Sequence, residues 1–532
     1  MTTRQRWTLV ATVIGSGAVF LDGTIVNVAL KAIGEDLPAS IIGVLEGQTY
    51  VVSGYLAVLA ALLILSGALS DHFGRRRIYA IGLGAFAITS ALCGLAPSLE
   101  WLVIFRLFQG AAGALLVPGS LALITEAFTG EERGRAFGVW AASTSALVLL
   151  GPLAGGLIVD TIGWRVAFLV NVPVLAFALW ATLVHVKRDE ATGGTSTFDW
   201  LGSIVAAVAV GGLAVGLIRG QEGAWADPVA WAILALGVAA LLVFPILMTR
   251  RADPLVPLDL FRSRAFATIN LATFFIYGAL YVTLSYQALV LQGVLGYTAL
   301  AAGAAGLPMG IFLTLLSTRV GTLAGRIGAR RFLTAGPLVM AAGVLWFVRL
   351  PVDSTAWVAS IDDPATLIPP LDAVVDVLPA AALFGIGISL VVAPLTSTLM
   401  GSVPGRHAGL GSAINNALSR VGQPLLGSIV FIVVSATFYG QLAAGTIGVD
   451  TSIDSVRQAF PPLNPPAPGA TPEQVAAANA ASIAAFHGAM LGAAILLVVG
   501  AVVDWIGLRP TSPAASTASP ATDGVAPDTG PT

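Results

Sequence analysis

The sequence predicts an all-α integral membrane protein, and its composition is the first reason. Charged residues make up 10% of the 532 residues, whereas soluble domains carry about 25%. Hydrophobic residues make up 56%, and the mean hydropathy is +0.89. A soluble chain of this length would form roughly two to four domains with polar surfaces, which so few charges cannot cover. The composition therefore excludes a soluble enzyme, a nucleic-acid binder and a disordered scaffold.

Fourteen apolar runs are the second reason, since about 20 helical residues cross the ~30 Å hydrocarbon core of a bilayer. They lie near residues 7–28, 48–70, 78–97, 101–125, 134–159, 165–185, 198–217, 228–248, 266–292, 299–320, 331–350, 375–398, 408–436 and 482–505. The seventh and eighth runs are either two full spans or one re-entrant unit. The first run is too long for a cleaved signal peptide and contains Asp22.

Lysine and arginine residues gather on one side of these spans. Of the 26, nineteen fall on the side that holds both termini and five on the opposite side, while Arg106 and Arg420 lie inside spans. Cytoplasmic loops carry the excess of basic residues in membrane proteins. We therefore expect a multi-pass protein of the plasma membrane with both termini in the cytoplasm.

Two segments are expected outside the bilayer without a fold of their own. Residues 510–532 are rich in Pro, Ser, Thr and Ala, which predicts a disordered cytoplasmic tail. The outward loop 437–481 contains a polyproline-like run at 461–466 and is too short for an enzyme domain. Thr471, Pro472 and Gln474 then match a helix start, so the last helix is expected to begin outside the bilayer.

An internal repeat divides the spans into two sets. The segment 67–77 joins the second and third spans, and 321–331, 254 residues later, joins the tenth and eleventh with a similar Gly- and Arg-rich pattern. Setting aside a central pair in 190–252 leaves six-helix halves at 1–189 and 253–509 in the same orientation. Parallel halves with a site between them are typical of secondary transporters. The alternative is that Gly-Arg-Arg turns recur in any cytoplasmic loop.

Several motifs resemble those of the major facilitator superfamily. Its loop signature G-x-x-x-D-x-x-G-R-R matches Gly67-Ala-Leu-Ser-Asp71-His-Phe-Gly74-Arg75-Arg76-Arg77. The span count resembles that of the fourteen-helix drug:proton antiporter branch. Three further segments resemble motifs of the same branch: Leu21–Leu30, Arg106–Gly110 and Gly151-Pro152-Leu-Ala-Gly155-Gly156. The resemblance covers about residues 7–510 and implies a major-facilitator fold of two six-helix halves plus two extra central helices.

The sequence departs from the family pattern at three positions. Lys31 stands where the family often has Pro, Tyr50 stands where Trp is common, and Gly325 replaces the acid of the second half. The resemblance implies a conformational latch around Asp71 that favours the outward-open state. Because Gly325 has no carboxylate, we expect the matching latch of the second half to be weaker or absent.

The motifs of the resemblance, together with the depth of Arg420 in its span, suggest candidate functional residues. Proton coupling and the substrate cavity are expected at Asp22, Asn27, Arg106, Gln109 and Arg420. The latch is expected at Gly67, Asp71, Gly74, Arg75, Arg76 and Arg77. The helix motif associated with antiport comprises Gly151, Pro152, Gly155 and Gly156. In that motif Pro152 can kink its helix, and Gly151 and Gly155 allow close helix approach.

Asp22 and Arg106 fall at one depth by residue counting. Asp22 is about 22 Å from the cytoplasmic entry of its span, and Arg106 about 8 Å from the opposite face. A charge at the bilayer centre costs at least ~2.5–3.5 kcal/mol, so each must face protein or water. The two residues either form a permanent salt bridge or compete with a proton or a cationic substrate. Arg420 lies ~18 Å deep and binds either an anionic group or a helix carbonyl, or has a structural role.

Metal and nucleotide chemistry have no sequence signal. Cys93 is the single cysteine, the four histidines show no ligand spacing, and no P-loop occurs. We expect no cofactor, no metal, no enzymatic activity and no nucleic-acid partner. The leading hypothesis is a monomeric transporter in the lipid bilayer that exports amphipathic drugs against inward proton flow. The alternatives are a proton-coupled transporter of one metabolite or lipid precursor, and a non-transporting receptor or channel.

Overall fold

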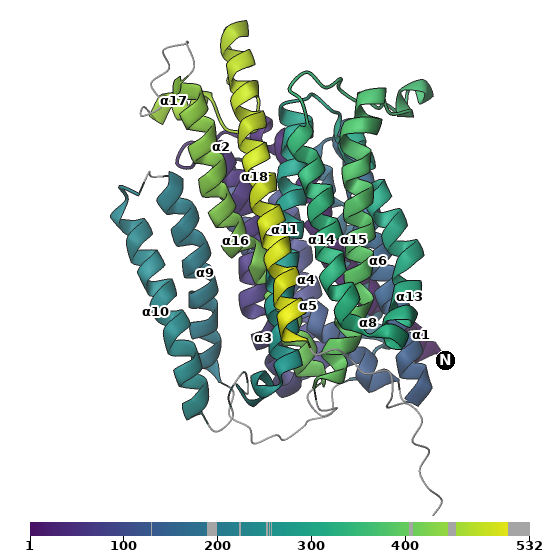
Figure 1. The fold of residues 1–532 in the computed structure, drawn as a ribbon. Coiled ribbons are helices and arrows are strands. Elements are labelled where there is room, and N and C mark those ends of the chain that lie inside the picture. Colours follow the sequence, from purple (N-terminus) through teal and green to yellow (C-terminus); the bar gives the residue numbers. More distant parts are fainter. Residues whose placement is uncertain are drawn as a thin grey trace, which may run out of the picture.

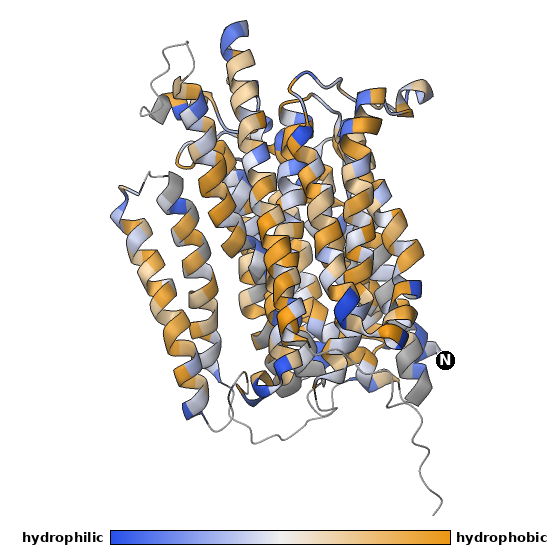
Figure 2. Cartoon of the chain, in the orientation of Figure 1, coloured by the Kyte–Doolittle hydropathy of each residue, from blue (hydrophilic) through white to orange (hydrophobic). Residues whose placement is uncertain are grey.

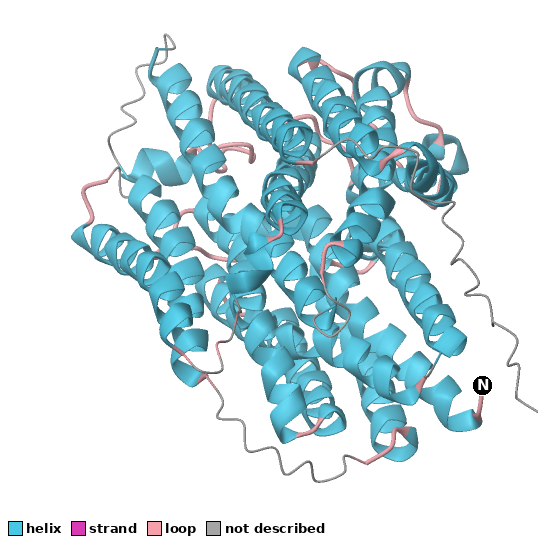
Figure 3. Ribbon diagram, turned by 60° about the horizontal axis from the view of Figure 1, so that its bottom comes forward, coloured by secondary structure: helices cyan, strands magenta, loops and turns pink. Residues whose placement is uncertain are grey.

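In a computed structural model the chain is helical throughout the part that is described, with no strand there (Figures 1 and 3). The described residues are 1–128, 130–188, 199–222, 225–251, 254, 256, 258–403, 408–444 and 454–508. The predicted disordered tail 510–532 lies outside them.

The first half of the chain forms six membrane-length helical units. They are α1 (Thr3–Asp36), α2, η1 and α3 together (Val44–Thr49, Tyr50–Gly54 and Tyr55–Phe73), α4 (Arg75–Gly94), α5 (Leu99–Ala127), α6 (Gly130–Thr161), and α7 with α8 (Trp164–Leu169 and Asn171–His185). The π-helical turn η1 lets one span continue from α2 into α3 without a break in the chain direction.

A helical pair and a second set of six units follow. The pair is α9 (Trp200–Glu222) and α10 (Pro228–Arg250). After η2 (Leu258–Arg262) come α11 (Arg264–Gly293), α12 with α13 (Ala299–Ala304 and Leu307–Ile327), α14 with η3 (Ala329–Trp346 and Phe347–Arg349), η4 (Pro364–Leu367), η5 with α15 (Ala373–Val377 and Leu378–Gly401), α16 (Ala408–Ala444), α17 (Asp454–Ala459) and α18 (Pro472–Gly507).

The helices have the length and apolarity that a bilayer requires. Among the described residues, thirteen helical segments are long and apolar enough to cross a membrane, and α6, 32 residues long with an apolar end at Leu150–Thr161, provides the fourteenth. Apolar colouring covers the middle of the bundle, and the hydrophilic residues gather at its two ends (Figure 2). This confirms the predicted all-α membrane fold with fourteen spans.

The extra pair consists of two full spans, which excludes the re-entrant alternative. Helices α9 and α10 are 23 residues each, or about 34 Å. They stand side by side at one edge of the bundle (Figure 1), where α9 packs on α3 of the first half and on α16 of the second. Helix α10 packs on α9 and exposes much of its apolar surface, as a lipid-facing helix does.

The predicted repeat has the same backbone at both of its joints. Gly74 ends α3 and starts α4 with φ 99° and ψ 129°, and Gly328 ends α13 and starts α14 with φ 94° and ψ 134°. A side chain is strongly disfavoured at such positive φ values, which explains why both copies place Gly at this point. The shared turn extends the likeness of the two segments from sequence to conformation.

The segment predicted as an outward loop is partly helical. Helix α16 continues to Ala444, and α18 begins at Pro472, so both extend into 437–481. The predicted start of the last helix is confirmed, because Thr471 and Gln474 form a capping box in which each side chain accepts a hydrogen bond from the other residue's backbone amide. At 36 residues, about 54 Å, α18 is longer than a bilayer core and extends beyond it.

Candidate functional site

A buried ion pair joins α1 and α5 in the middle of the first half. The Arg106 Nη1 atom lies 2.5 Å from Asp22 Oδ2, and both side chains are 1% exposed. Arg106 also donates to the Val51 carbonyl at 2.9 Å and to Gln109 Oε1 at 2.7 Å. The pairing expected from matched depth is therefore confirmed, and Gln109 belongs to the same cluster.

Further side chains complete the surroundings of Asp22. Gln109 Nε2 donates to Asp22 Oδ1 at 3.1 Å, and Asn171 Nδ2 from α8 donates to the same oxygen at 3.4 Å. The Tyr55 ring lies 3.9 Å from the Arg106 guanidinium carbon, in cation–π contact. Sequence reasoning did not identify Asn171 or Tyr55, since neither polarity nor spacing distinguishes them from other membrane-helix residues.

In this arrangement the charge of Asp22 affects how strongly Arg106 is held. Removing one partner of a buried ion pair leaves an uncompensated charge, at a cost of about 3–5 kcal/mol. Asp22 keeps Gln109 and Asn171 as donors if Arg106 moves, and Arg106 keeps the Val51 carbonyl and the Tyr55 ring if Asp22 is neutralised. Each residue of the pair thus has other partners. These partners lower the free-energy cost of separating Asp22 from Arg106 when a proton or a cation binds Asp22 instead.

Arg420 approaches the same centre from the second half. It is 4% exposed on α16, and its guanidinium carbon lies 5.1 Å from the ring centre of Phe20, two residues before Asp22. Its Nε atom and the Gln423 Oε1 atom, one turn later, are buried without a hydrogen-bond partner. No carboxylate pairs with Arg420 among the described ion pairs, and the Phe20 ring is the contact found.

The halves are held together at the end opposite the N-terminus. Asp160 at the end of α6 accepts hydrogen bonds from the backbone amides of Ala299 and Leu300 at 3.0 and 2.6 Å, at the start of α12. Asn27 Oδ1 accepts from Ser285 Oγ at 2.8 Å. The predicted residue Asn27 thus lies at the contact between α1 and α11.

A second contact closes the same end. The side-chain amides of Gln48 and Asn464 exchange two hydrogen bonds of 2.8 Å, and both side chains are buried. Between the halves, a cavity of about 20 Å³ is lined by Ser53, Tyr286 and Gln423 among others. A cavity of this size holds about one water molecule. The contacts of Asp160 with the start of α12 and of Gln48 with Asn464 close this end.

The glycines predicted to permit close helix approach do so. A Cβ atom at Gly151 would lie 2.0 Å from Thr24 Oγ1, and one at Gly155 would lie 3.1 Å from the Ile25 Cα, so both face α1. Gly156 faces the other half, where a Cβ would lie 2.3 Å from the Ala299 carbonyl oxygen. Pro152, also in this motif, lies inside the continuous helix α6.

The loop motif is described only in part. The backbone of Gly67 and Asp71 belongs to α3, and the surroundings of these two residues lie outside the described part of the chain. Arg75 Nη1 donates to the Ala122 carbonyl at 3.5 Å, and Arg76 donates to the carbonyls of Thr182 and Leu183. Cations near the last carbonyls of a helix are favourable, so these arginines fasten α4 to α5 and α8. Arg77 is exposed.

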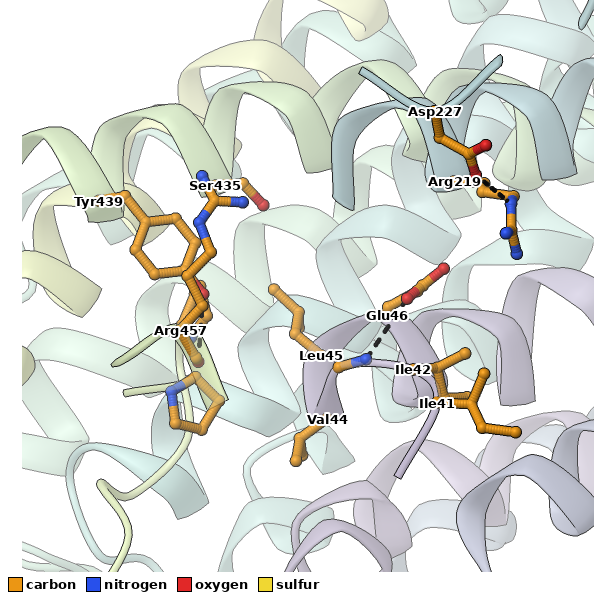
Figure 4. A pocket seen from close by; sticks show the side chains of 13 residues that line it. Ile41, Ile42, Val44, Leu45, Glu46, Arg219, Asp227, Ser435, Tyr439 and Arg457 are labelled. Atoms are coloured by element: carbon orange, nitrogen blue, oxygen red, sulfur yellow. Dashed lines mark hydrogen bonds and ion pairs between the residues drawn. The ribbon is translucent and has the colours of Figure 1, made fainter. Parts of the chain in front are cut away.

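A larger pocket lies at the far end of the molecule from the N-terminus, between the extra pair and the bundle (Figure 4). Its volume is about 260 Å³, and its charged lining includes Glu46, Arg219, Asp227 and Arg457. The Val229 amide and Arg219, whose Nε lies 2.6 Å from Asp227 Oδ2, hold the pKa of Asp227 below its usual value. The residues of the Asp22 centre do not line this pocket.

Within the described residues, no group of three or more His, Cys, Asp or Glu side chains could hold a metal ion.

Residues 12–427 match the family model described as Major Facilitator Superfamily.

Curated relatives resemble the chain over most of its length. Multidrug resistance protein Stp of Mycobacterium tuberculosis is 34% identical over 82% of this chain and 78% of its own. The tetracenomycin C resistance and export protein of Streptomyces glaucescens is 32% identical over 82% and 77%. Multidrug transporter protein MdtP of Bacillus subtilis is 30% identical over 76% and 70%.

Solved structures share the fold. A bacterial homologue of the human lysosomal transporter Spinster, in an inward-facing and unoccupied conformation, superposes with a TM-score of 0.64 and 17% identity, covering 95% of this chain and 97% of the other. A D-xylose–proton symporter superposes with a TM-score of 0.57 and 16% identity, covering 95% and 98%.

Proposed function

Because the chain belongs to the Major Facilitator Superfamily, we propose that it is a drug efflux transporter that exchanges protons for amphipathic compounds. The relatives named for multidrug resistance and antibiotic export support drug efflux, and they are transporters rather than enzymes. Coupling to protons rests on one observation, the buried pair of Asp22 and Arg106 at the centre of the first half.

Asp22 is the proposed site of exchange between proton and substrate. Coupling requires that the proton and the substrate favour different states of one group. When the substrate occupies the centre, the Asp22 carboxylate is ionised and pairs with a cation, either Arg106 or the substrate. When a proton binds Asp22, Arg106 keeps the Val51 carbonyl and the Tyr55 ring as partners, and the substrate loses its counter-charge.

The surroundings of Arg420 favour aromatic amphipathic substrates. Phe20 provides a ring face, and the unpartnered Arg420 Nε atom provides a hydrogen-bond donor. Ring contacts tolerate many substrate shapes, because stacking and cation–π attraction depend less on exact position than hydrogen bonds do. A transporter of a single metabolite would need several fixed polar partners in this centre.

The proposal is tested with purified protein in liposomes whose interior is more acidic than the medium. Aromatic cationic, aromatic neutral and non-aromatic polar compounds form the panel. We expect accumulation of the aromatic members that depends on the pH gradient and stops when an ionophore removes it. Accumulation of one polar metabolite alone would support the alternative of a specific transporter, and gradient-independent equilibration would exclude antiport.

We propose that the side with the N-terminus is cytoplasmic and that the protein lies in the plasma membrane. The excess of basic residues on that side supports this orientation. Single cysteines replacing the exposed Arg188 and Glu473 test it in a Cys93→Ser background. Serine retains a hydrogen-bond donor at the position from which the buried Cys93 thiol donates to Gln109 Oε1.

We expect an impermeant thiol reagent added to intact cells to label Glu473→Cys only. Labelling of Arg188→Cys should require opened cells. External labelling of Arg188→Cys would reverse the proposed orientation.

The latch around Asp71 remains a proposal, supported by the motif and by the Gly74 turn that orients α4. Asp71→Asn is expected to reduce transport while the protein still inserts. Cross-linking of the two halves should then show a changed balance of outward-open and inward-open states, and an unchanged balance would refute the latch.

A further inference from the structure

A second buried carboxylate lies in the second half, toward the side of the molecule that holds the N-terminus. Asp504 is 1% exposed on α18, three residues before that helix ends, and neither of its oxygen atoms has a hydrogen-bond partner. Sequence counting places it at the edge of a span, where acids are ordinarily solvated. The fold instead encloses it between helices.

The neighbours of Asp504 on α18 show which surface it faces. A Cβ at Gly500 would lie 2.8 Å from Ile276 Cγ1, and one at Gly507 would lie 2.2 Å from Thr268 Oγ1, so both glycines contact α11 closely. Positions 500, 504 and 507 share one helix face. Asp504 therefore points toward α11, at the level between Thr268 and Ile276, where the glycines bring the two backbones close together.

An ionised Asp504 is unfavourable in this conformation. A buried carboxylate without partners loses several kcal/mol of hydration. The position adds to this cost, because the last turn of a helix carries the negative end of its dipole, which repels anions. The neutral, protonated carboxyl avoids both penalties.

Two arginines lie beside Asp504 but bind other groups. Arg264 of α11 donates to the Ile506 carbonyl at 2.6 Å, and Arg330 of α14 donates to the Trp505 carbonyl at 2.6 and 2.9 Å while its guanidinium covers the Trp505 ring. Helix α16 meets α18 nearer the opposite end, where Gly488 faces Val433. Arg264 and Arg330 are thus the charged groups that the described neighbours of α18 bring to its end.

We propose that Asp504 is a second proton-binding site, separate from Asp22. It holds a proton while the end of α18 is packed on α11. When that end separates from α11, the proton passes to water. The ionised carboxylate then pairs with Arg264 or Arg330, which gives up its hydrogen bond to a backbone carbonyl of α18. Charge-assisted hydrogen bonds are about twice as strong as neutral ones, so this exchange stabilises the separated state.

This inference concerns a different half from the Asp22 centre and is tested without substrate or transport. Infrared spectroscopy of the purified full chain detects the C=O stretch of a protonated carboxylic acid. We expect that band in wild type at neutral pH, its loss in Asp504→Asn, and its retention in Asp22→Asn. The asparagine has nearly the shape of the protonated acid, so Asp504→Asn should fold normally.

Arg330→Gln provides a measurement that does not alter the carboxyl itself. Without Arg330 the ionised form loses a partner, so the band should persist to higher pH by about one unit, a tenfold change in proton affinity. Arg331→Gln, an exposed neighbour on the same helix, is the matched control and should leave the band unchanged.

Two results would overturn the proposal. One is an identical carboxylic-acid band in wild type and Asp504→Asn across the pH range, which would mean that Asp504 is ionised throughout. The other is a carboxylate band of Asp504 that responds to Na⁺ but not to pH, which would indicate a cation site. Neither result bears on whether Asp22 couples drug export to protons.

Discussion

Asp22→Asn is expected to abolish proton-driven accumulation, because an amide cannot bind and release a proton. A pH difference of one unit provides about 1.4 kcal/mol per proton, or about tenfold accumulation for one-to-one exchange. The liposome assay should therefore show about tenfold accumulation in wild type and only passive equilibration in the mutant. A neutral substrate should still bind, whereas a cationic one should bind more weakly without the Asp22 charge.

Asp36→Asn is the matched control for this experiment. Asp36 lies on the same helix and pairs with Arg165, but both side chains are more than 40% exposed, so this pair contributes at most about 1 kcal/mol. The Asp36→Asn variant should therefore leave the coupling of transport to protons intact. Arg106→Ala should damage transport as Asp22→Asn does, because it leaves the Asp22 carboxylate without its ionic partner. Coupling at the wild-type level in Asp22→Asn would remove this residue from the mechanism.

Gly156→Ala is expected to open the end of the molecule that is closed in this structure. Its new methyl group would lie 2.3 Å from the Ala299 carbonyl oxygen, a backbone atom that cannot turn away. Overpacking of this kind costs about 1–3 kcal/mol, which shifts an equilibrium between two conformations by roughly 5- to 150-fold. Alanine favours helix more than glycine, so α6 itself should not suffer.

Labelling of a cysteine at Ser285 measures this shift, since Ser285 binds Asn27 between the halves. In a Cys93→Ser background, external labelling should become faster in Gly156→Ala and transport should fall. Gly440→Ala is the control, because a Cβ at this glycine near the same end of α16 would meet nothing within 4 Å. Equal labelling rates in the reference protein, in Gly156→Ala and in Gly440→Ala would contradict the prediction.

The sequence was sufficient to predict the spans and the ion pair. Hydropathy and the distribution of arginine identified the helices, because a bilayer imposes a length and a sidedness that residue counting measures directly. Equal depth made a pair of Asp22 and Arg106 one of the expected arrangements, and the structure shows this pair. Gly74 and Gly328 were predictable as a repeat because their positive φ restricts the choice of residue.

The lateral contacts were not predictable in this way. Depth gives a coordinate along the membrane normal, and it does not say which face of a helix meets which neighbour. Asn171, Tyr55 and Asp160 acquire their contacts only from the packing of helices far apart in the sequence. Asp504 was missed for a related reason, because a residue counted near a span end is assumed to reach water, and only the packing of α18 on α11 encloses it.

The extra pair makes the rim of the transporter asymmetric. Two seams run between the halves, one where α3 meets α16 and one where α6 meets α12. Helix α9 lies over the first seam, while α6 and α13 stand at the other edge of the molecule (Figure 1). The extra pair thus shields the seam of α3 and α16 from the lipid on one flank of the bundle, whereas the seam of α6 and α12 lies on the flank away from the pair.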